Sequence, residues 1–220
     1  MNKDELDKYV EGLKAQNWED KYDKDFMRVG YNKDFDKMVE KPIFILHDWL
    51  IKETEPICKE SHISLLDVGC CNGLLLYRML QGLPIDTATG VDVSDVALTT
   101  AKSNLKQFGD KVKLVKSFGE KLPFKDNEFD VVVSAQVIEH VKDPRQFISE
   151  AVRVAKICAL FVTPIENKIE DPMHINSFTY DNIIEMFEET GYDFSVGMMS
   201  KFRREDVNSH CFGIRVIKNE

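Results

Sequence analysis

Apolar residues in the central part of the chain gather in short runs, and most of these runs are followed by a longer stretch with helical character. Short continuous apolar runs are typical of strands that are covered on both faces of a sheet. They predict strands at Ile63–Val68, Thr87–Val93, Lys111–Lys116, Phe129–Ser134 and Ile157–Thr163. Pro164 follows the last of these strands and is expected to end it.

The segments between the strands have patterns that favour helices. These helices are predicted at Leu74–Leu80, Val96–Phe108, Pro144–Lys156 and Thr179–Glu189. Asp143 before Pro144 is typical of a helix start, and Gly191 is typical of a helix end. Two further strands, Tyr192–Met199 and Cys211–Ile217, are expected to form a hairpin. This order predicts an α/β fold with a seven-stranded, mostly parallel sheet, helices on both faces and a terminal antiparallel hairpin.

Residues 1–60 differ from the rest of the chain because their apolar residues are scattered among charges. This pattern predicts short amphipathic helices rather than a disordered tail. It is stronger from Phe35 to Lys59, where Pro42 interrupts it early. We therefore expect an N-terminal helical lead-in or cap at residues 1–60 and one main domain at residues 61–220. The lead-in could either cover a sheet edge or cap a substrate pocket.

Composition narrows the classes of protein to consider. The 220 residues are 43% hydrophobic and 30% charged, as in a soluble globular protein, and the net charge of −9 argues against nucleic acid as a partner. No stretch reaches the roughly 20 apolar residues of a membrane span, and the charged N-terminus is unlike a signal peptide. The cysteines lack a C-x-x-C pair, which predicts reduced thiols, a cytoplasmic location and no metal centre. They are Cys58, Cys70, Cys71, Cys158 and Cys211.

The strongest candidate for a ligand site is the turn after the first predicted strand, in the run Leu65-Leu66-Asp67-Val68-Gly69-Cys70-Cys71-Asn72-Gly73. Gly69 and Gly73 lack a Cβ, so a ligand can approach the backbone closely. The spacing differs from the G-x-G-x-x-G of dinucleotide-binding turns. Asp67 would lie unfavourably beside a pyrophosphate and favours a cationic ligand, such as an amino acid with a positive group. The alternative is an ordinary strand-to-helix turn.

The segment Leu66–Gly73 resembles the first motif of the class I S-adenosylmethionine-dependent methyltransferases, which usually reads LDxGxGxG. Cys71 stands in place of the middle glycine. Later segments keep the family's order and spacing, and the resemblance covers Ile63 to Val216. It implies a Rossmann-like fold with S-adenosyl-L-methionine as the cofactor. In the turn, the resemblance implies cofactor contacts by Asp67, Gly69, Cys70, Cys71, Asn72 and Gly73.

The second predicted strand reaches Asp92 and Val93, which we add to the expected cofactor site. A carboxylate at the end of this strand can accept two hydrogen bonds from a ribose diol. The alternative role for Asp92 is to cap the next helix. Ser94 or Asp95 can fill that role already, which favours ligand binding by Asp92.

The segment Ser117–Phe124 resembles the family segment GDAEELPF, whose acidic second residue commonly meets the adenine amino group. Phe118 stands at that position here. Its ring could pack on the adenine base or, alternatively, within the loop. Gly119 and Glu120 can still offer backbone groups or a carboxylate to the adenine edge.

The segment Ala135–Val141 resembles the family segment ending in EHV, which is found in the branch that includes ubiquinone-biosynthesis methyltransferases. In that fold, residues just beyond the fourth strand face the methyl group. Ser134 and Gln136 therefore complete the expected cofactor site, and His140 is expected beside the methyl position.

A second histidine lies in the segment Pro172–Thr179, where related methyltransferases form part of the acceptor pocket. A hydroxyl acceptor benefits from a general base, and histidine suits that task. We predict His140 and His174 as the catalytic residues, acting as base or as acceptor-orienting group. The alternative for His140 is a capping or packing role. The basic run Lys201–Arg204 is either a solvated loop or a site for an anionic acceptor.

These features predict a methyltransferase that acts on a small-molecule acceptor, with O-methylation favoured and N-methylation as the alternative. A nicotinamide-dependent oxidoreductase is disfavoured by the glycine spacing and by Asp67. A non-catalytic binding scaffold that keeps the fold stays open, because Cys71 and Phe118 depart from the family pattern.

Overall fold

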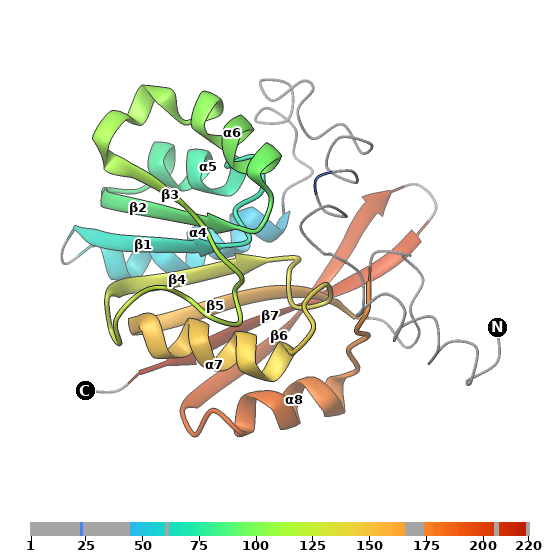
Figure 1. The fold of residues 1–220 in the computed structure, drawn as a ribbon. Coiled ribbons are helices and arrows are strands. Elements are labelled where there is room, and N and C mark those ends of the chain that lie inside the picture. The colour runs from blue at the N-terminus through green and yellow to red at the C-terminus, as the bar shows by residue number, and fades with distance from the viewer. Residues whose placement is uncertain (1–22, 24–44, 60–61, 166–173, 205–206, 219–220) are drawn as a thin grey trace.

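The computed structural model describes residues 23, 45–59, 62–165, 174–204 and 207–218, and their seven strands form one sheet in the order β3-β2-β1-β4-β5-β7-β6 (Figure 1). The strands are β1 (Ile63–Val68), β2 (Ile85–Asp92), β3 (Val112–Lys116), β4 (Phe129–Ala135), β5 (Ala155–Ile165), β6 (Asp193–Arg204) and β7 (Val207–Ile217). The helices are α4 (Ile45–Cys58), α5 (Leu74–Gly82), α6 (Asp95–Asn104), α7 (Pro144–Val154) and α8 (Tyr180–Glu188), with a short 3-10 helix η1 (Lys106–Lys111).

One strand runs against the others. The pairs among β3, β2, β1, β4 and β5 are parallel, whereas β7 is antiparallel to both β5 and β6. The seven-stranded, mostly parallel sheet with a terminal antiparallel hairpin is therefore confirmed. No helix in the described part of the chain is both long and apolar enough to cross a membrane.

Helices cover both faces of the sheet, and neighbouring strand residues point to opposite sides. Leu66 and Val132 lie in the core cluster shared with α7 and α8. Leu65 and Val131 lie in the cluster shared with α4 and α5. Figure 1 shows this division, with α7 and α8 on one side of the sheet and α4, α5 and α6 on the other. Because both faces are buried, the inner strands are apolar without alternation.

The ends of two strands differ from the prediction. Pro164 does not end β5, which continues to Ile165. Beyond Val162 this strand has no β4 partner and pairs with β7 alone, so the missing N–H of proline removes no bond on the β4 side. The run Lys201–Arg204, predicted as a loop, belongs to β6. Its side chains lie outside the described part, so an anionic acceptor stays a prediction.

One predicted helix is divided in two. The helix expected at Val96–Phe108 ends at Asn104, and η1 follows it. Gly109 inside η1 has a φ of 55°, which breaks the regular helical backbone. The other helices begin and end within a few residues of the expected places, because their caps are local. Asp143 accepts from the Gln146 N–H and Thr179 accepts from the Asn182 N–H, as N-caps do.

Most of the predicted N-terminal lead-in lies outside the described residues. Its last part forms α4, which buries Leu46 and Leu50 against the sheet. From residues 1–44 the structure describes Asp23, whose carboxylate accepts hydrogen bonds from the Ser94 hydroxyl and the Val96 N–H. The division of the chain at residue 60 stays a prediction.

Candidate functional site

The turn between β1 and α5 has the backbone geometry of a tight glycine turn. Gly69 and Gly73 have φ values of 83° and 80°, in the left-handed region that favours glycine. Cys71 also has a positive φ, 50°, where a side chain is disfavoured. The N–H groups of Gly69 and Cys70 both donate to the Val91 carbonyl, which ties the turn to the end of β2.

Packing gives a second reason for the two glycines. A Cβ on Gly69 would lie 2.3 Å from Val137 Cγ2, and a Cβ on Gly73 would lie 2.7 Å from Leu105 Cδ1. Real Cβ atoms do not approach other atoms so closely. The contact with Val137 also places the segment after β4 directly against the glycine turn. The turn and the histidine-bearing segment are therefore neighbours at the carboxyl edge of the sheet.

Asp67 is a buried carboxyl group that lacks part of its expected hydrogen bonding. It lies at the end of β1 with 1% of its surface exposed, and its Oδ2 has no hydrogen-bond partner within the described structure. Burial, and secondarily the negative charge of Asp92, raise the pKa of Asp67 to about 8. A cationic ligand group would offset both effects. The position thus fits the positive amino group of an amino-acid ligand.

Asp92 organises the turn as well as facing the site. Its Oδ2 accepts from the Cys71 N–H at 2.9 Å, and its Oδ1 accepts from the Ser94 N–H at 2.9 Å. Burial raises the pKa of Asp92, while these backbone hydrogen bonds oppose the rise. The side chain of Ser94 caps α6 by accepting from the Ala97 N–H. Asp92 is therefore not needed as the side-chain cap, as predicted.

The segment after β3 lies beside Asp92, because the Ser117 N–H donates to the Asp92 carbonyl. Phe118 is 43% exposed. A Cβ on Gly119 would lie 2.1 Å from a ring carbon of Phe147, so this glycine is required by packing against α7. Glu120 accepts from the Lys142 N–H at 3.1 Å. Among Phe118, Gly119 and Glu120, Phe118 has the most exposed side chain and is the most accessible to a ligand.

The remaining residues predicted for the cofactor support the site through the backbone. The hydroxyl of Ser134 donates to the Val68 carbonyl and is buried. The N–H of Gln136 donates to the Val162 carbonyl, and its φ is 58°. Asn72 Oδ1 accepts from the Leu74 N–H at the start of α5. Val93 is half-buried between β2 and α6.

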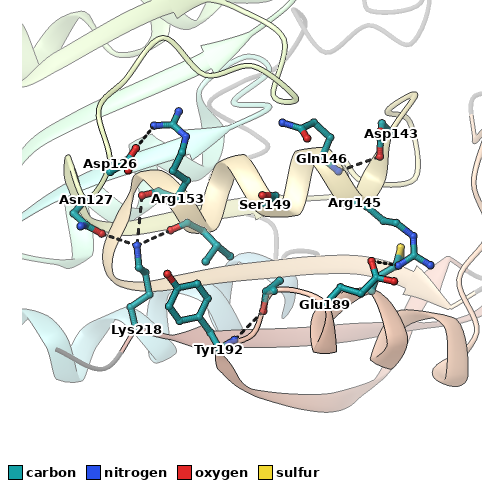
Figure 2. Close-up of a pocket in the computed structure, with 13 residues that line it drawn as sticks. Asp126, Asn127, Asp143, Arg145, Gln146, Ser149, Arg153, Glu189, Tyr192 and Lys218 are labelled. Atoms are coloured by element: carbon teal, nitrogen blue, oxygen red, sulfur yellow. Dashed lines mark hydrogen bonds and ion pairs between the residues drawn. The ribbon is translucent and has the colours of Figure 1, made fainter.

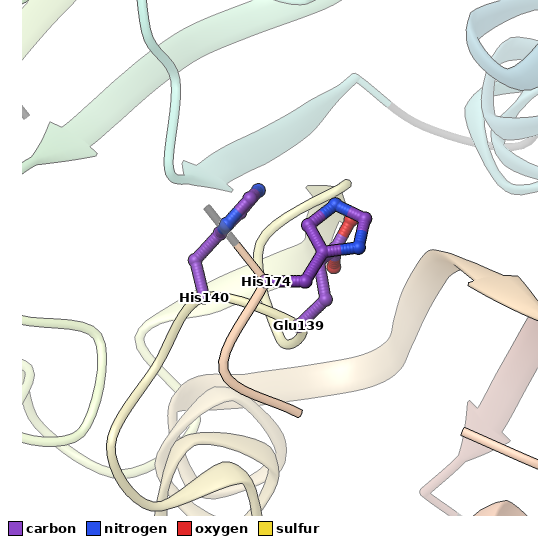
Figure 3. Close-up of side chains that lie close together, drawn as sticks. All are labelled: Glu139, His140 and His174. Atoms are coloured by element: carbon purple, nitrogen blue, oxygen red, sulfur yellow. The ribbon is translucent and has the colours of Figure 1, made fainter. Parts of the chain in front are cut away.

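His140 and His174 meet although they come from different loops. Their ring centroids lie 4.9 Å apart in an edge-to-face arrangement. The fully buried Glu139 lies next to them, and Figure 3 shows the three side chains together. Glu139 belongs to the EHV segment, and no role was predicted for it from the sequence. A carboxylate directly after the apolar pair Val137 and Ile138 was the available signal.

A network of backbone contacts holds these two loops together. The Glu139 carbonyl accepts from the N–H groups of Ile175 and Asn176. The Asn176 side-chain amide donates to the carbonyls of Ile138 and Val141, at 3.2 and 2.7 Å. Asn176 was also missed from the sequence, since an asparagine in a polar loop carries no distinctive signal. The relative placement of the two histidines depends on this network.

A groove of about 570 Å³ lies elsewhere, along the outer side of α7 (Figure 2). Its basic side chains are already paired: Arg145 with Glu185 and Glu189, and Arg153 with Asp126. Lys218 donates to Asn127 and to backbone carbonyls. No residue predicted for the cofactor or for catalysis lines this groove. The glycine turn, where the predicted residues lie, is therefore the candidate functional site.

Known proteins share this core. Residues 66–163 match a family model described as a methyltransferase domain. A ubiquinone biosynthesis O-methyltransferase from Saccharophagus degradans is 32% identical over 117 residues, which are 53% of this chain and 49% of the relative. A demethylmenaquinone methyltransferase from Leptospira interrogans is 27% identical over 157 residues, 67% of this chain and 63% of the relative. The chain thus spans less than two thirds of either relative.

A solved structure shows the same fold. Phosphoethanolamine N-methyltransferase 2 from Haemonchus contortus, in complex with S-adenosyl-L-methionine, has a TM-score of 0.67 at 17% sequence identity. The likeness covers 80% of this chain and 53% of that one. The sheet order, the glycine turn that lies between the acidic ends of β1 and β2, and the matching family model agree with one another. Residues 66–163 of the chain therefore form a methyltransferase domain of the class I S-adenosylmethionine-dependent type.

Proposed function

We propose that this protein transfers a methyl group from S-adenosyl-L-methionine to a hydroxyl group of a small molecule. The observation that carries the proposal is the buried carboxyl group of Asp67, which lacks a partner for one oxygen inside a glycine turn. Asp92 and the pair His140 and His174 lie at the same edge of the sheet. The name of the Saccharophagus degradans relative supports oxygen rather than nitrogen as the acceptor atom.

Two carboxyl groups suit the two ends of the donor. The cofactor supplies an electrophilic methyl group on a positively charged sulfur. Asp67 would pair with the ammonium group of its methionine part, which explains why a carboxyl group is tolerated in a buried position. Asp92 uses one lone pair on each oxygen for the backbone, and carboxylate oxygens have further lone pairs to accept from a ribose diol.

The histidine pair suits the acceptor. Methyl transfer is an in-line displacement, so the site must hold the acceptor oxygen in line with the methyl group and exclude water. A hydroxyl must also lose its proton, and His140 or His174 would take it or orient the oxygen. An amine acceptor needs no base once it is unprotonated. The effect of the histidines on turnover therefore distinguishes the two kinds of acceptor.

Donor binding is tested first, by titrating the purified protein with S-adenosylhomocysteine in a calorimeter. We expect Asp92→Ala to weaken binding by about 1.5–3 kcal/mol, the scale for a hydrogen bond to a charged group. Asp95→Ala is the matched control, because Asp95 is exposed and pairs with Lys116 outside the site. Equal affinity in wild type and Asp92→Ala would remove Asp92 from the donor site.

Acceptor chemistry is tested with labelled cofactor and a panel of matched hydroxyl and amine compounds. With a hydroxyl acceptor, His140→Ala or His174→Ala should lower turnover by roughly 10²–10⁴-fold. Affinity for S-adenosylhomocysteine should barely change. Near-full turnover in both variants, or transfer to amines alone, would contradict O-methylation with a histidine at the acceptor. Binding of the cofactor with no transfer to any compound would favour a binding scaffold.

A further inference from the structure

We propose that Glu139, His140 and His174 form a binding site for one divalent transition-metal ion, which receives the oxygen atoms of the acceptor. The role at the acceptor rests on the proposed function, whereas the binding of the ion does not. The cysteine pattern gave no reason to expect a metal. The site emerges from the fold, since His174 is brought from the loop after β5 to the segment after β4.

The geometry is close to that of a metal site. One ligand atom from each residue can be chosen so that all three lie within 4.8 Å of one another. Ligand atoms about 2.1 Å from a shared ion lie about 3.0–3.5 Å apart in octahedral or tetrahedral sites. Small rotations of the two half-buried imidazoles would close this difference. Three protein ligands also leave positions for further oxygen atoms, as in catalytic rather than structural metal sites.

The ligands are held in place by neighbouring groups. Thr163 donates from its hydroxyl to Glu139 Oε2 at 3.2 Å, which orients the carboxylate. Asn176 links both ligand-bearing loops through the carbonyls of Ile138 and Val141. Groups that orient metal ligands in this way contribute strongly to affinity. Glu139 is fully buried, and burying a carboxylate is costly unless a positive charge lies beside it. A bound cation would supply that charge.

The donor set selects the kind of ion. Two imidazoles and one carboxylate suit Zn²⁺, Co²⁺, Fe²⁺ and Mn²⁺, whereas Mg²⁺ and Ca²⁺ prefer sites made of oxygens. One carboxylate against two positive charges leaves an excess of one positive charge. That excess favours an acceptor that binds through an ionised oxygen. The site therefore favours compounds with two neighbouring oxygens, such as vicinal hydroxyls, which can occupy two open positions together.

The site also lies where an acceptor is needed. Val137 contacts Gly69 of the donor turn, and Glu139 and His140 follow it directly. A cation lowers the pKa of a hydroxyl that it binds, so the hydroxyl proton passes to solvent. The oxygen then forms the new bond to the methyl carbon, and the electron pair of the broken carbon–sulfur bond stays on sulfur. In this arrangement both histidines act as metal ligands, and neither takes the proton.

The test is a titration of the full-length, tag-free protein with Co²⁺, after treatment with EDTA and dialysis. We expect one equivalent to bind with visible absorption bands typical of nitrogen and oxygen ligands, without a thiolate charge-transfer band. His140→Ala and His174→Ala should each weaken binding by at least about 100-fold, since even changes to supporting groups cost 10–100-fold. His62→Ala is the matched control, because His62 is an exposed histidine that pairs with Asp86.

Folding of each variant is checked by its affinity for S-adenosylhomocysteine, which should stay unchanged. If a histidine variant does not fold, Glu139→Gln provides the same test with a side chain of nearly equal size. Equal Co²⁺ binding in wild type and in the folded variants would overturn the site. Methyl transfer that resists EDTA, in a protein that binds no Co²⁺, would overturn the inference and leave the proposed function intact. Co²⁺ binding without methyl transfer to any compound would support the metal site and contradict the proposed function.

Discussion

At the scale of single residues, the site depends on where side chains are absent as much as on where they are present. Gly69 is fixed by its φ of 83° and by the nearby Val137 side chain. The sequence motif led us to expect this glycine for close approach of a ligand. The structure adds a contact with the protein itself. Changes at this residue therefore affect the glycine turn and the segment after β4 together.

We expect Gly69→Ala to abolish detectable binding of S-adenosylhomocysteine and to destabilise the fold by about 1–3 kcal/mol, because the new Cβ displaces Val137. The variant is compared by calorimetry and by urea unfolding with Gly82→Ala. A Cβ on Gly82, at the end of α5, meets no atom within 4 Å. Normal binding by a folded Gly69→Ala variant would show that the donor lies elsewhere.

Asp67 makes the stability of the cofactor-free protein depend on pH. Its pKa of about 8 in the fold exceeds the ordinary value of about 3.9, so the folded state holds the proton more tightly. The stability that the folded state gains from holding this proton is fully present below about pH 4 and is lost as the pH rises through about 8. The free energy of unfolding of wild type should therefore fall relative to Asp67→Asn by up to about 1.4 kcal/mol per pH unit within that window.

Urea unfolding of both proteins at several pH values measures this difference. Saturating S-adenosylhomocysteine should flatten the wild-type curve, since a neighbouring ammonium group stabilises the ionised carboxylate. Parallel curves for wild type and Asp67→Asn would contradict the raised pKa.

At the scale of elements, the parts that could be predicted are those set by neighbouring residues. The strand Ile63–Val68 and the caps of α7 and α8 depend on local pattern and on side chains within one turn. The meeting of Glu139 with His174 depends instead on how two loops fold onto each other. No periodicity encodes such a contact. The same applies to Pro164, which is tolerated in β5 because of its particular partners.

Asn176 is expected to position the histidines without touching the donor. Asn176→Ala removes two hydrogen bonds to the segment after β4 and should cost about 1–3 kcal/mol in stability. Turnover should fall at least tenfold while affinity for S-adenosylhomocysteine is kept. Asn182→Ala is the matched control, since Asn182 bonds within the start of α8 at Thr179 and Ser177. A similar loss of turnover in both variants would reduce Asn176 to a general structural role.

At the scale of the whole molecule, the late strand β7 joins the edge strand β6 to the rest of the sheet. It lies between β5 and β6, and α4 from the start of the described chain packs on it. The contact is close, because a Cβ on Gly213 would lie 2.8 Å from the Trp49 ring. Segments far apart in the sequence are thus joined on one face of the sheet.

Substitutions at two paired glycines, Gly213 and Gly197, test the contact between α4 and β7. Gly213→Ala should lower the free energy of unfolding by about 1–3 kcal/mol, because the new methyl group displaces Trp49. Gly197 is the register partner of Gly213 on β6, and a Cβ there would lie 4.0 Å from the Gly213 carbonyl oxygen, an ordinary contact distance. Gly197→Ala should be neutral or stabilise by about 0.4–1 kcal/mol through the unfolded chain. Equal effects, measured by urea unfolding, would show that α4 does not pack tightly on β7.

The position of β7 has a consequence for synthesis of the protein on the ribosome. β5 and β6 are complete before β7 is made, yet β7 is the strand that pairs with both. At ~5–20 residues per second, the apolar edge of β5 stays open for several seconds during translation. An open edge of this kind can pair with other nascent chains. The edge of β5 is therefore open to such pairing until β7 has been made and has inserted between β5 and β6.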